Sequence, residues 1–330
     1  MKVSWSGMSS LAKKFALGID IGGTKLRVGL VSEELELVDL LITKEHRILN
    51  PESLINMVAD CISQLIDRHQ GIELIGAGVG YPGPINFPDG STFSYCNLLS
   101  SEWNSIALRE MIKCKIGLPT LLDNDANLAG LAEMRLGSGQ NLSNVVYLTI
   151  STGIGGAIFI DRKIYRGFLG SAGEFGHMVI DIHGGECKCG NKGCFMSQAS
   201  GLGLEKIIKE SPSCSFLFSN QEDNDDYVKK LLDLAISGHP SALEVIQPLA
   251  DQISAAFLNI LHILNPEAII VGGSLGKVFL HLFSPSINQY LKSHLPKELI
   301  DQTRILEAKL GDVNGILGGA ILVFDDLERR

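Results

Sequence analysis

The sequence lacks any long apolar segment. Nowhere in its 330 residues does an apolar run approach the eighteen or so positions that a membrane-spanning helix needs. The first fourteen residues, MKVSWSGMSSLAKK, contain no apolar stretch of the length found in secretory signals. We therefore expect a cytoplasmic protein that does not associate with membranes.

Positive charge is also scarce. Lys and Arg total 28 against 37 Asp and Glu, which gives a formal net charge of −9, and no long basic run stands out locally. Proteins that bind nucleic acids usually present a basic surface to the phosphates, so we expect no nucleic-acid partner. The composition is otherwise that of a folded globular protein, with 45% hydrophobic and 20% charged residues. The length predicts about two domains.

Seven cysteines are distributed unevenly. Four are scattered, whereas Cys187, Cys189 and Cys194 lie within eight residues, a pattern typical of a local metal site rather than of a disulfide framework. His177 precedes Cys187 by ten residues, and a set of one imidazole and three thiolates suits tetrahedral zinc. Shielded thiols and an iron–sulfur site are alternatives at this point, and His183 is an alternative fourth ligand.

Two segments of the chain resemble each other. FALGIDIGGTKLRVGLV (15–31) and VVYLTISTGIGGAIFID (145–161) each contain two β-favouring apolar runs around a turn rich in glycine and threonine. The pair indicates an internal duplication of a hairpin. Further strands and helices alternate after each hairpin, as at 52–68 and 74–81, which predicts an α/β fold with two related lobes that face a central cleft.

The turns of both hairpins suit phosphate binding. Glycines let the backbone approach a phosphate closely, although an ordinary β-turn explains either turn taken alone. We expect Asp20 to hold Mg²⁺ through water, because this ion loses its water reluctantly, and the threonine hydroxyls to donate to phosphate oxygens. The strand IIVGG ends in two glycines that can pack against a nucleotide, or simply form a strand-to-helix turn. The candidate ATP-binding residues are Asp20, Gly22, Gly23, Thr24, Lys25, Thr152, Gly153, Gly272 and Gly273.

Six motifs follow one another along the chain: DIGGTK, GYPGPI, LLDNDAN, STGIGGA, GEFGH with CKCGNKGC, and IIVGG. Together they resemble bacterial sugar kinases of the repressor/open-reading-frame/kinase (ROK) family over Phe15 to about Val323. The resemblance implies the two-lobed actin-like ATPase fold, a duplicated ribonuclease-H-like architecture, and ATP-dependent phosphorylation of a hexose. We expect an N-terminal lobe over 1–134, completed by a helix at about 315–330, and a C-terminal lobe with the zinc loop over 135–314.

The resemblance also implies roles for particular residues. Asp125 matches the catalytic base, which accepts the proton of the attacking sugar hydroxyl. Contacts to the sugar are implied for Gly83, Asn124, Glu174 and His177. Since Asp and Asn are favoured at helix N-caps, a capping cluster is the alternative for DND, and Asp123 is interpreted as structural.

Two further expectations rest on the resemblance. Zinc with four protein ligands, His177, Cys187, Cys189 and Cys194, is implied to be structural and to shape the sugar-binding loop. The chain is implied to form a homodimer.

The sequence departs from the family pattern in two places. Met196 stands two residues after the last zinc cysteine, where many members have a second sugar-binding glutamate, and a thioether cannot replace that acceptor. Ser197 or Gln198 can compensate. The segment NLLSSEW (97–103) is longer than the usual one at the lip of the sugar pocket.

The motifs allow more than one function for the protein. Transfer of the γ-phosphoryl group of ATP to the 6-hydroxyl of glucose is the first, with N-acetylmannosamine, N-acetylglucosamine or fructose as alternative acceptors. A catalytically weak sugar or nucleotide sensor, suggested by Met196, is the second. The family's repressors carry a helix-turn-helix domain ahead of the kinase-like body, and the fourteen residues before the first strand are too few for one, so we expect no repressor.

Overall fold

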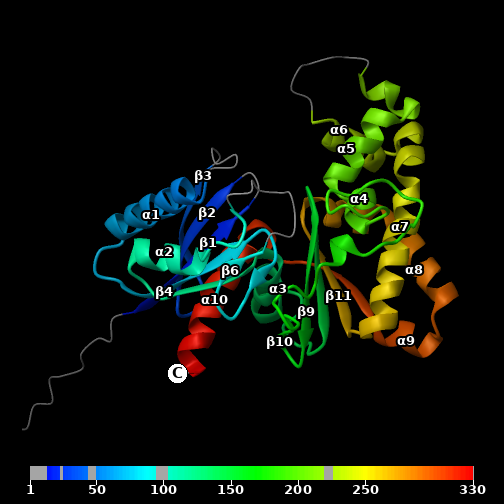
Figure 1. The fold of residues 1–330 in the computed structure, drawn as a ribbon. Helices are drawn as coiled ribbons and strands as arrows, with labels where there is room; N and C mark the ends of the chain where they lie inside the picture. Colours follow the sequence, from blue (N-terminus) through cyan, green and yellow to red (C-terminus); the bar gives the residue numbers. More distant parts are fainter. Residues whose placement is uncertain (1–12, 23–24, 44–49, 94–102, 219–225, 330) are drawn as a thin grey trace, which may run out of the picture.

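The computed structural model describes residues 13–22, 25–43, 50–93, 103–218 and 226–329 (Figure 1). The elements of the first part of the chain are β1 (Lys14–Ile21), β2 (Leu26–Ser32), β3 (Leu37–Thr43), α1 (Pro51–Arg68), β4 (Glu73–Tyr81), β5 (Ile85–Asn86), β6 (Ser91–Thr92), α2 (Leu108–Ile116), β7 (Thr120–Asn124) and α3 (Asp125–Leu136).

The second part begins with another hairpin and then becomes mainly helical. Its strands are β8 (Val145–Ile150), β9 (Ile154–Ile160), β10 (Lys163–Ile164), β11 (Ala268–Gly272) and β12 (Arg304–Glu307). Its helices are α4 (Phe195–Ala199), α5 (Gly201–Glu210), α6 (Tyr227–Ile236), α7 (Pro240–Leu264), α8 (Ser274–His294), α9 (Lys297–Gln302) and α10 (Asn314–Arg329). Short 3₁₀ turns lie at η2 (Phe175–His177), η3 (Pro212–Phe218) and η4 (Gly311–Val313).

The two larger sheets share one topology. The first has the strand order β3-β2-β1-β4-β7, and the second has the order β10-β9-β8-β11-β12. In each sheet the first three strands in the chain form an antiparallel meander, and two later strands extend the sheet in parallel from its central strand, which is β1 or β8. The repeated order is what a duplicated α/β unit produces, and it confirms the α/β fold with two related sheets.

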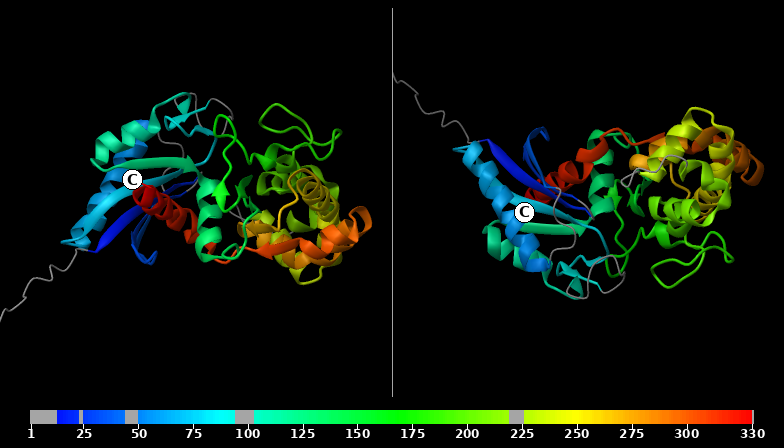
Figure 2. Two further views of the ribbon diagram at one scale, coloured as in Figure 1. Left: turned by 90° about the horizontal axis from the view of Figure 1, so that it is seen from below. Right: turned by 90° about the horizontal axis from the view of Figure 1, so that it is seen from above.

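Helices cover the two sheets unequally. Helices α1 and α2 pack on one face of the first sheet, where Leu17 and Ile19 of β1 meet Val58 of α1 and Ile112 of α2. Helices α4 to α8 cover the outer face of the second sheet. The views in Figure 2 show α3 and α10 between the two sheets, so the inner faces of both sheets share one apolar core.

The final helix, α10, lies directly on the first sheet. A Cβ atom on Gly78 of β4 would overlap the carbonyl oxygen of Gly319, so helix and strand approach to backbone contact. Such an approach requires glycine. The chain therefore returns from the second sheet to complete the packing of the first, as Figure 1 shows for the red helix beside β4 and α3.

Most of the expected elements occur close to their predicted positions. The hairpins at 15–31 and 145–161 are β1–β2 and β8–β9, and the helix expected at 52–68 is α1. Residues 97–102 of the NLLSSEW segment fall outside the described residues. None of the helices in the described part of the chain is both long enough and apolar enough to span a membrane.

Candidate active site and metal site

The C-terminal ends of three strands align at one edge of the first sheet. Strands β1, β4 and β7 are parallel, and their register places Asp20 beside Gly80 and Gly80 beside Asp123. The ends of neighbouring parallel strands meet at the same edge, where ligands of open α/β sheets commonly bind. The sheet therefore brings Asp20 close to the DND segment, which lies about a hundred residues later in the sequence.

Asn124 is the N-cap of α3. Its side-chain oxygen accepts hydrogen bonds from the backbone N–H groups of Ala126 (2.9 Å) and Asn127 (3.2 Å). Its amide nitrogen donates to the carbonyl oxygen of Gly83 at 3.2 Å. The capping alternative considered for this segment thus describes Asn124, and the same side chain fixes the position of the Gly83 loop.

Asp125 opens α3 and is partly buried among carboxylates. Loss of hydration, together with the negative charges of Asp20 and Glu174, raises the pKa of its carboxyl to about 7. The N–H of Ala126 donates to Asp125 Oδ1 at 2.8 Å, and this hydrogen bond lowers the pKa of the carboxyl. Burial also raises the pKa of Glu174. A carboxylate poised near neutral pH is suited to accept a proton.

Asp20 forms an ion pair across its own hairpin. Arg27 is its partner in the register of β1 and β2, and Arg27 Nη1 donates to Asp20 Oδ2 at 2.8 Å. Both side chains are largely buried, and the guanidinium also lies 3.7 Å from the exposed Asp312. Arg27 is not among the residues predicted from the sequence, although it lies as far from the GGTK turn as Asp20 does, and this equal distance is a signal for cross-strand pairing.

The turn of the first hairpin is closed by a hydrogen bond from Gly22 N to Lys25 O (3.0 Å). Gly23 and Thr24, two of the predicted phosphate-binding residues, lie outside the described residues. The turn of the second hairpin, which includes Thr152 and Gly153, contacts the start of α5. Gly201 N donates to Ser151 O (2.8 Å), and Leu202 N donates to Thr152 O (3.1 Å).

Met196 lies between Gly153 and the Glu174–His177 segment. Its methyl group is 3.6 Å from where a Cβ on Gly153 would be, and it would crowd a Cβ on Gly176 at 2.8 Å. The thioether is therefore packed against both the second hairpin turn and the 3₁₀ turn that ends at His177.

Gly272 and Gly273 are required by the local packing. Gly273 has a positive φ of 82° and caps α8, and a Cβ on it would overlap Ile150 O. A Cβ on Gly272 would lie 2.7 Å from the hydroxyl of Tyr147. The strand-to-helix turn considered as an alternative is thus present, and a role in nucleotide binding stays a prediction.

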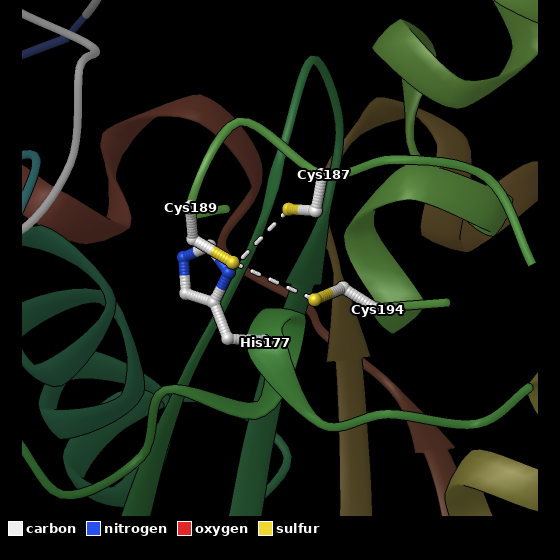
Figure 3. Close-up of side chains that lie close together, drawn as sticks. All are labelled: His177, Cys187, Cys189 and Cys194. Carbon is white, nitrogen blue, oxygen red and sulfur yellow. Dashed lines mark hydrogen bonds between the residues drawn. The ribbon is translucent and has the colours of Figure 1, made fainter. Parts of the chain in front are cut away.

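The four predicted zinc ligands lie together. The ligand atoms of His177, Cys187, Cys189 and Cys194 are all within 4.8 Å of one another, and Figure 3 shows their side chains converging. His177 Nδ1 is 3.7 Å from Cys187 Sγ, and Cys189 Sγ is 3.6 Å from Cys194 Sγ. Tetrahedral zinc with Zn–S bonds of about 2.3 Å separates its ligand atoms by roughly 3.5–3.8 Å. The spacing therefore suits such an ion.

The loop that carries these ligands is folded back on itself. Cys187 N donates to Asn191 O (2.8 Å), Gly190 has a positive φ of 92°, and Val179 pairs with Cys194. Burial lowers the pKa of His177, which favours the neutral imidazole that binds metals. His183, the alternative ligand, is exposed and is not part of this group.

Asp123 is bound by Arg166, a residue that no motif of the sequence includes. Arg166 Nε (2.8 Å) and Nη2 (2.6 Å) both donate to Asp123 Oδ2, while Asn127 Nδ2 donates to Oδ1 at 2.8 Å. Arg166 follows β10 of the second sheet, so the pair connects two distant parts of the chain. No local pattern predicts a contact between residues 43 positions apart.

Comparison with known proteins places the chain in a family. A sequence model of the ROK family matches residues 16–326. The chain belongs to the ROK family. It is 29% identical over 320 residues to a glucokinase from Halalkalibacterium halodurans, an alignment that covers 95% of this chain and 96% of the relative.

A solved structure supports the fold. The ROK family glucokinase from Streptomyces griseus, in complex with glucose and AMPPNP, matches with a TM-score of 0.79 and 28% identity over 94% of this chain and 99% of that chain. The actin-like ATPase fold implied by the motifs is thereby confirmed.

The family also includes proteins that are not kinases by name. The xylose repressor of Bacillus spizizenii is 30% identical over 316 residues, which are 94% of this chain and 77% of the repressor. Membership of the family therefore leaves the reaction to be argued from the site.

Proposed function

We propose that this protein is an ATP-dependent hexose kinase with Asp125 as its general base. The observation that carries the proposal is the position of Asp125. It lies at the edge of the first sheet where β1, β4 and β7 end, and the negative charges of Asp20 and Glu174 raise the pKa of its carboxyl. Related ROK proteins named glucokinase, one of them crystallised with glucose and an ATP analogue, support this function.

The step itself requires little covalent chemistry from the protein. The oxygen of the sugar 6-hydroxyl attacks the γ-phosphorus, the bond from that phosphorus to the bridging oxygen of ADP breaks, and the hydroxyl proton passes to Asp125. Phosphoryl transfer depends mainly on positioning and on neutralising charge. Asn124, Gly83, Glu174 and His177 are proposed to orient the sugar, and the two hairpin turns are proposed to hold the phosphates.

Two metal ions are part of the proposal. Zinc, held by His177 and the three cysteines, is proposed to fix the loop beside the sugar; with four protein ligands it supplies no Lewis acid. Mg²⁺ would neutralise charge on the phosphates. Because Asp20 Oδ2 already accepts a bond from Arg27, contact with Mg²⁺ through water suits Asp20 better than direct ligation.

The sugar is tested by coupled ADP release with Mg·ATP and a panel of glucose, mannose, fructose, N-acetylglucosamine and N-acetylmannosamine. We expect glucose to give the highest kcat/KM. A higher value for one of the other sugars would replace glucose as the substrate and leave the kinase in place. Absence of sugar-stimulated ADP release across the panel would reject the kinase.

Met196 favours a second candidate, a sugar or nucleotide sensor with little transferase activity. Its thioether packs beside the Glu174–His177 segment and offers no strong acceptor to a sugar hydroxyl. Met196→Glu separates the two functions. If the protein is a kinase with a weakened sugar contact, the variant should lower the KM for the sugar, whereas a sensor should bind ATP and sugar with no gain in turnover.

We also propose that the chain forms a homodimer, as the family resemblance implies. Light scattering of the purified protein tests this, and a monomeric mass would reject it.

A further inference from the structure

The proposed sugar-binding residues come from two separate parts of the fold. Gly83, Asn124 and Asp125 belong to the edge of the first sheet, whereas Glu174 and His177 follow the meander of the second. Their relative position must be fixed by contacts between those two parts, because the segments are more than forty residues apart in sequence.

The segment from Arg166 to Gly173 makes such contacts. It leaves β10 of the second sheet, and its Ala172 N donates to Arg166 O at 3.1 Å, which closes the loop. A Cβ on Gly170 would overlap Ile85 O of the first part of the chain. The segment therefore rests on β5, which follows β4 of the first sheet, immediately before it reaches Glu174.

The Arg166 side chain extends this contact to the edge that holds the proposed base. Its guanidinium carbon lies 3.7 Å from the centroid of the Phe87 ring, and two of its nitrogens bind Asp123 Oδ2. The Asp123 side chain is 1% exposed and that of Arg166 is 20% exposed, so water competes little with the pair. The other oxygen of Asp123 accepts from Asn124 N at 2.8 Å.

We propose that Arg166 is a positioning residue that sets Asn124 and Asp125 against Glu174 and His177. One carboxylate, Asp123, is bound on one side by the second sheet's loop and on the other by the backbone of Asn124. Displacement of Arg166 would shift both halves of the sugar site relative to each other. The inference rests on the proposed kinase function.

The test compares Arg166→Met with Arg135→Met. Arg135, near the far end of α3, also pairs with an aspartate, Asp325 of α10, so the control loses an Arg–Asp pair at a distance from the proposed site. We expect Arg166→Met to lower kcat/KM for glucose about 100-fold, the size of effect that a displacement of about 1 Å can produce. The affinity for AMPPNP without sugar, measured by calorimetry, should be unchanged in both variants.

A lysine at this position provides a second measure. Arg166→Lys keeps the positive charge but lacks the planar guanidinium that aims two N–H groups at Asp123 Oδ2, so we expect a loss of about 10-fold in kcat/KM. This variant carries the test if Arg166→Met does not fold. The double variant Asp123→Asn/Arg166→Met should have the same kcat/KM as Arg166→Met alone, because both substitutions remove the same Arg166–Asp123 contact.

The outcomes are distinguishable. Equal kcat/KM values for Arg166→Met and Arg135→Met, per folded molecule, would overturn the positioning role while the kinase stands. Wild-type protein that phosphorylates no sugar would overturn both. A lower melting temperature with wild-type kinetics would assign Arg166 to stability alone and so would also reject the proposal.

Discussion

The two hairpins that begin the two sheets have the same topology but different chemistry. In the first, the pair next to the turn is Ile21 with Leu26, followed by Asp20 with Arg27. In the second, the corresponding pairs are Ile150 with Ile154 and Thr149 with Gly155. Apolar residues thus occupy the first position in both copies, whereas the second position is an ion pair in one and two small uncharged residues in the other.

This difference indicates how the duplicated unit is used. The strand order and apolar pairs are needed to fold either copy, so they are shared. Charge is concentrated at the edge of the first sheet, through Asp20, Asp123 and Asp125. The second copy supplies small residues at its turn and, after its meander, the histidine–cysteine group. We therefore expect loss of the Asp125 carboxylate in the first copy to affect turnover, and loss of the histidine–cysteine group in the second copy to affect sugar binding.

The largest effect should come from Asp125→Asn. The variant keeps the side-chain oxygen that accepts from Ala126 N but cannot accept the sugar proton, so kcat should fall about 10³-fold. Asp67→Asn, an exposed change in α1, is the control and should retain wild-type turnover. Coupled ADP release with saturating glucose measures both. Retention of more than a tenth of the wild-type kcat would exclude Asp125 as the base.

Cys189→Ser tests the contribution of the second copy. Loss of one thiolate should abolish stoichiometric zinc, measured by metal analysis of the purified protein, and raise the KM for glucose about 10–100-fold, the range seen when groups that orient a metal site are removed. The matched control is Cys114→Ser, because Cys114 is an exposed thiol outside the group. Unchanged metal content in Cys189→Ser would contradict the assignment of the four ligands.

The pH profile of kcat/KM tests whether the pKa of Asp125 is raised above that of an ordinary exposed aspartate. The raised pKa of Asp125, about 7, means that protonation removes the base below neutral pH. Activity should therefore fall about tenfold for each pH unit below 7 and level off above it. A decline that begins only near pH 4 would show that burial, Asp20 and Glu174 do not raise the pKa of this carboxyl.

Local patterns predicted more of the fold than of the site. Turn residues and alternating apolar runs placed both hairpins, and helical spacing placed α1, because those elements depend on neighbours in sequence. Close spacing of the cysteines also predicted that they lie together, and the structure brings them together with His177. The Arg166–Asp123 pair and the contact of Gly78 with Gly319 could not be predicted, because each joins segments that only the completed fold brings together.

Asp123 shows the limit of motif-based interpretation. Its position in LLDNDAN suggested a cap, and it does accept from Asn124 N, but its main partner is the guanidinium of Arg166. The motif identifies a cluster of acceptors and gives no information on which distant donor binds it.

The smallest expected effect concerns the free energy of unfolding, which the buried charge of Asp125 should lower. Asp125 has a folded-state pKa above its unfolded value, so the folded chain holds this proton more tightly and its stability falls as pH rises from about 4 to 7. Asp125→Asn cannot ionise and should be more stable than wild type above pH 7. Each pKa unit corresponds to about 1.4 kcal/mol, and partial exposure of the side chain reduces the total, so we expect a gain of about 2 kcal/mol at pH 8 that shrinks toward pH 4. Urea unfolding of both proteins at the two pH values measures this, with Asp67→Asn as the control that should show no such gain. An inactive Asp125→Asn with unchanged stability at pH 8 would mean that Asp125 serves catalysis and that its negative charge does not destabilise the folded chain.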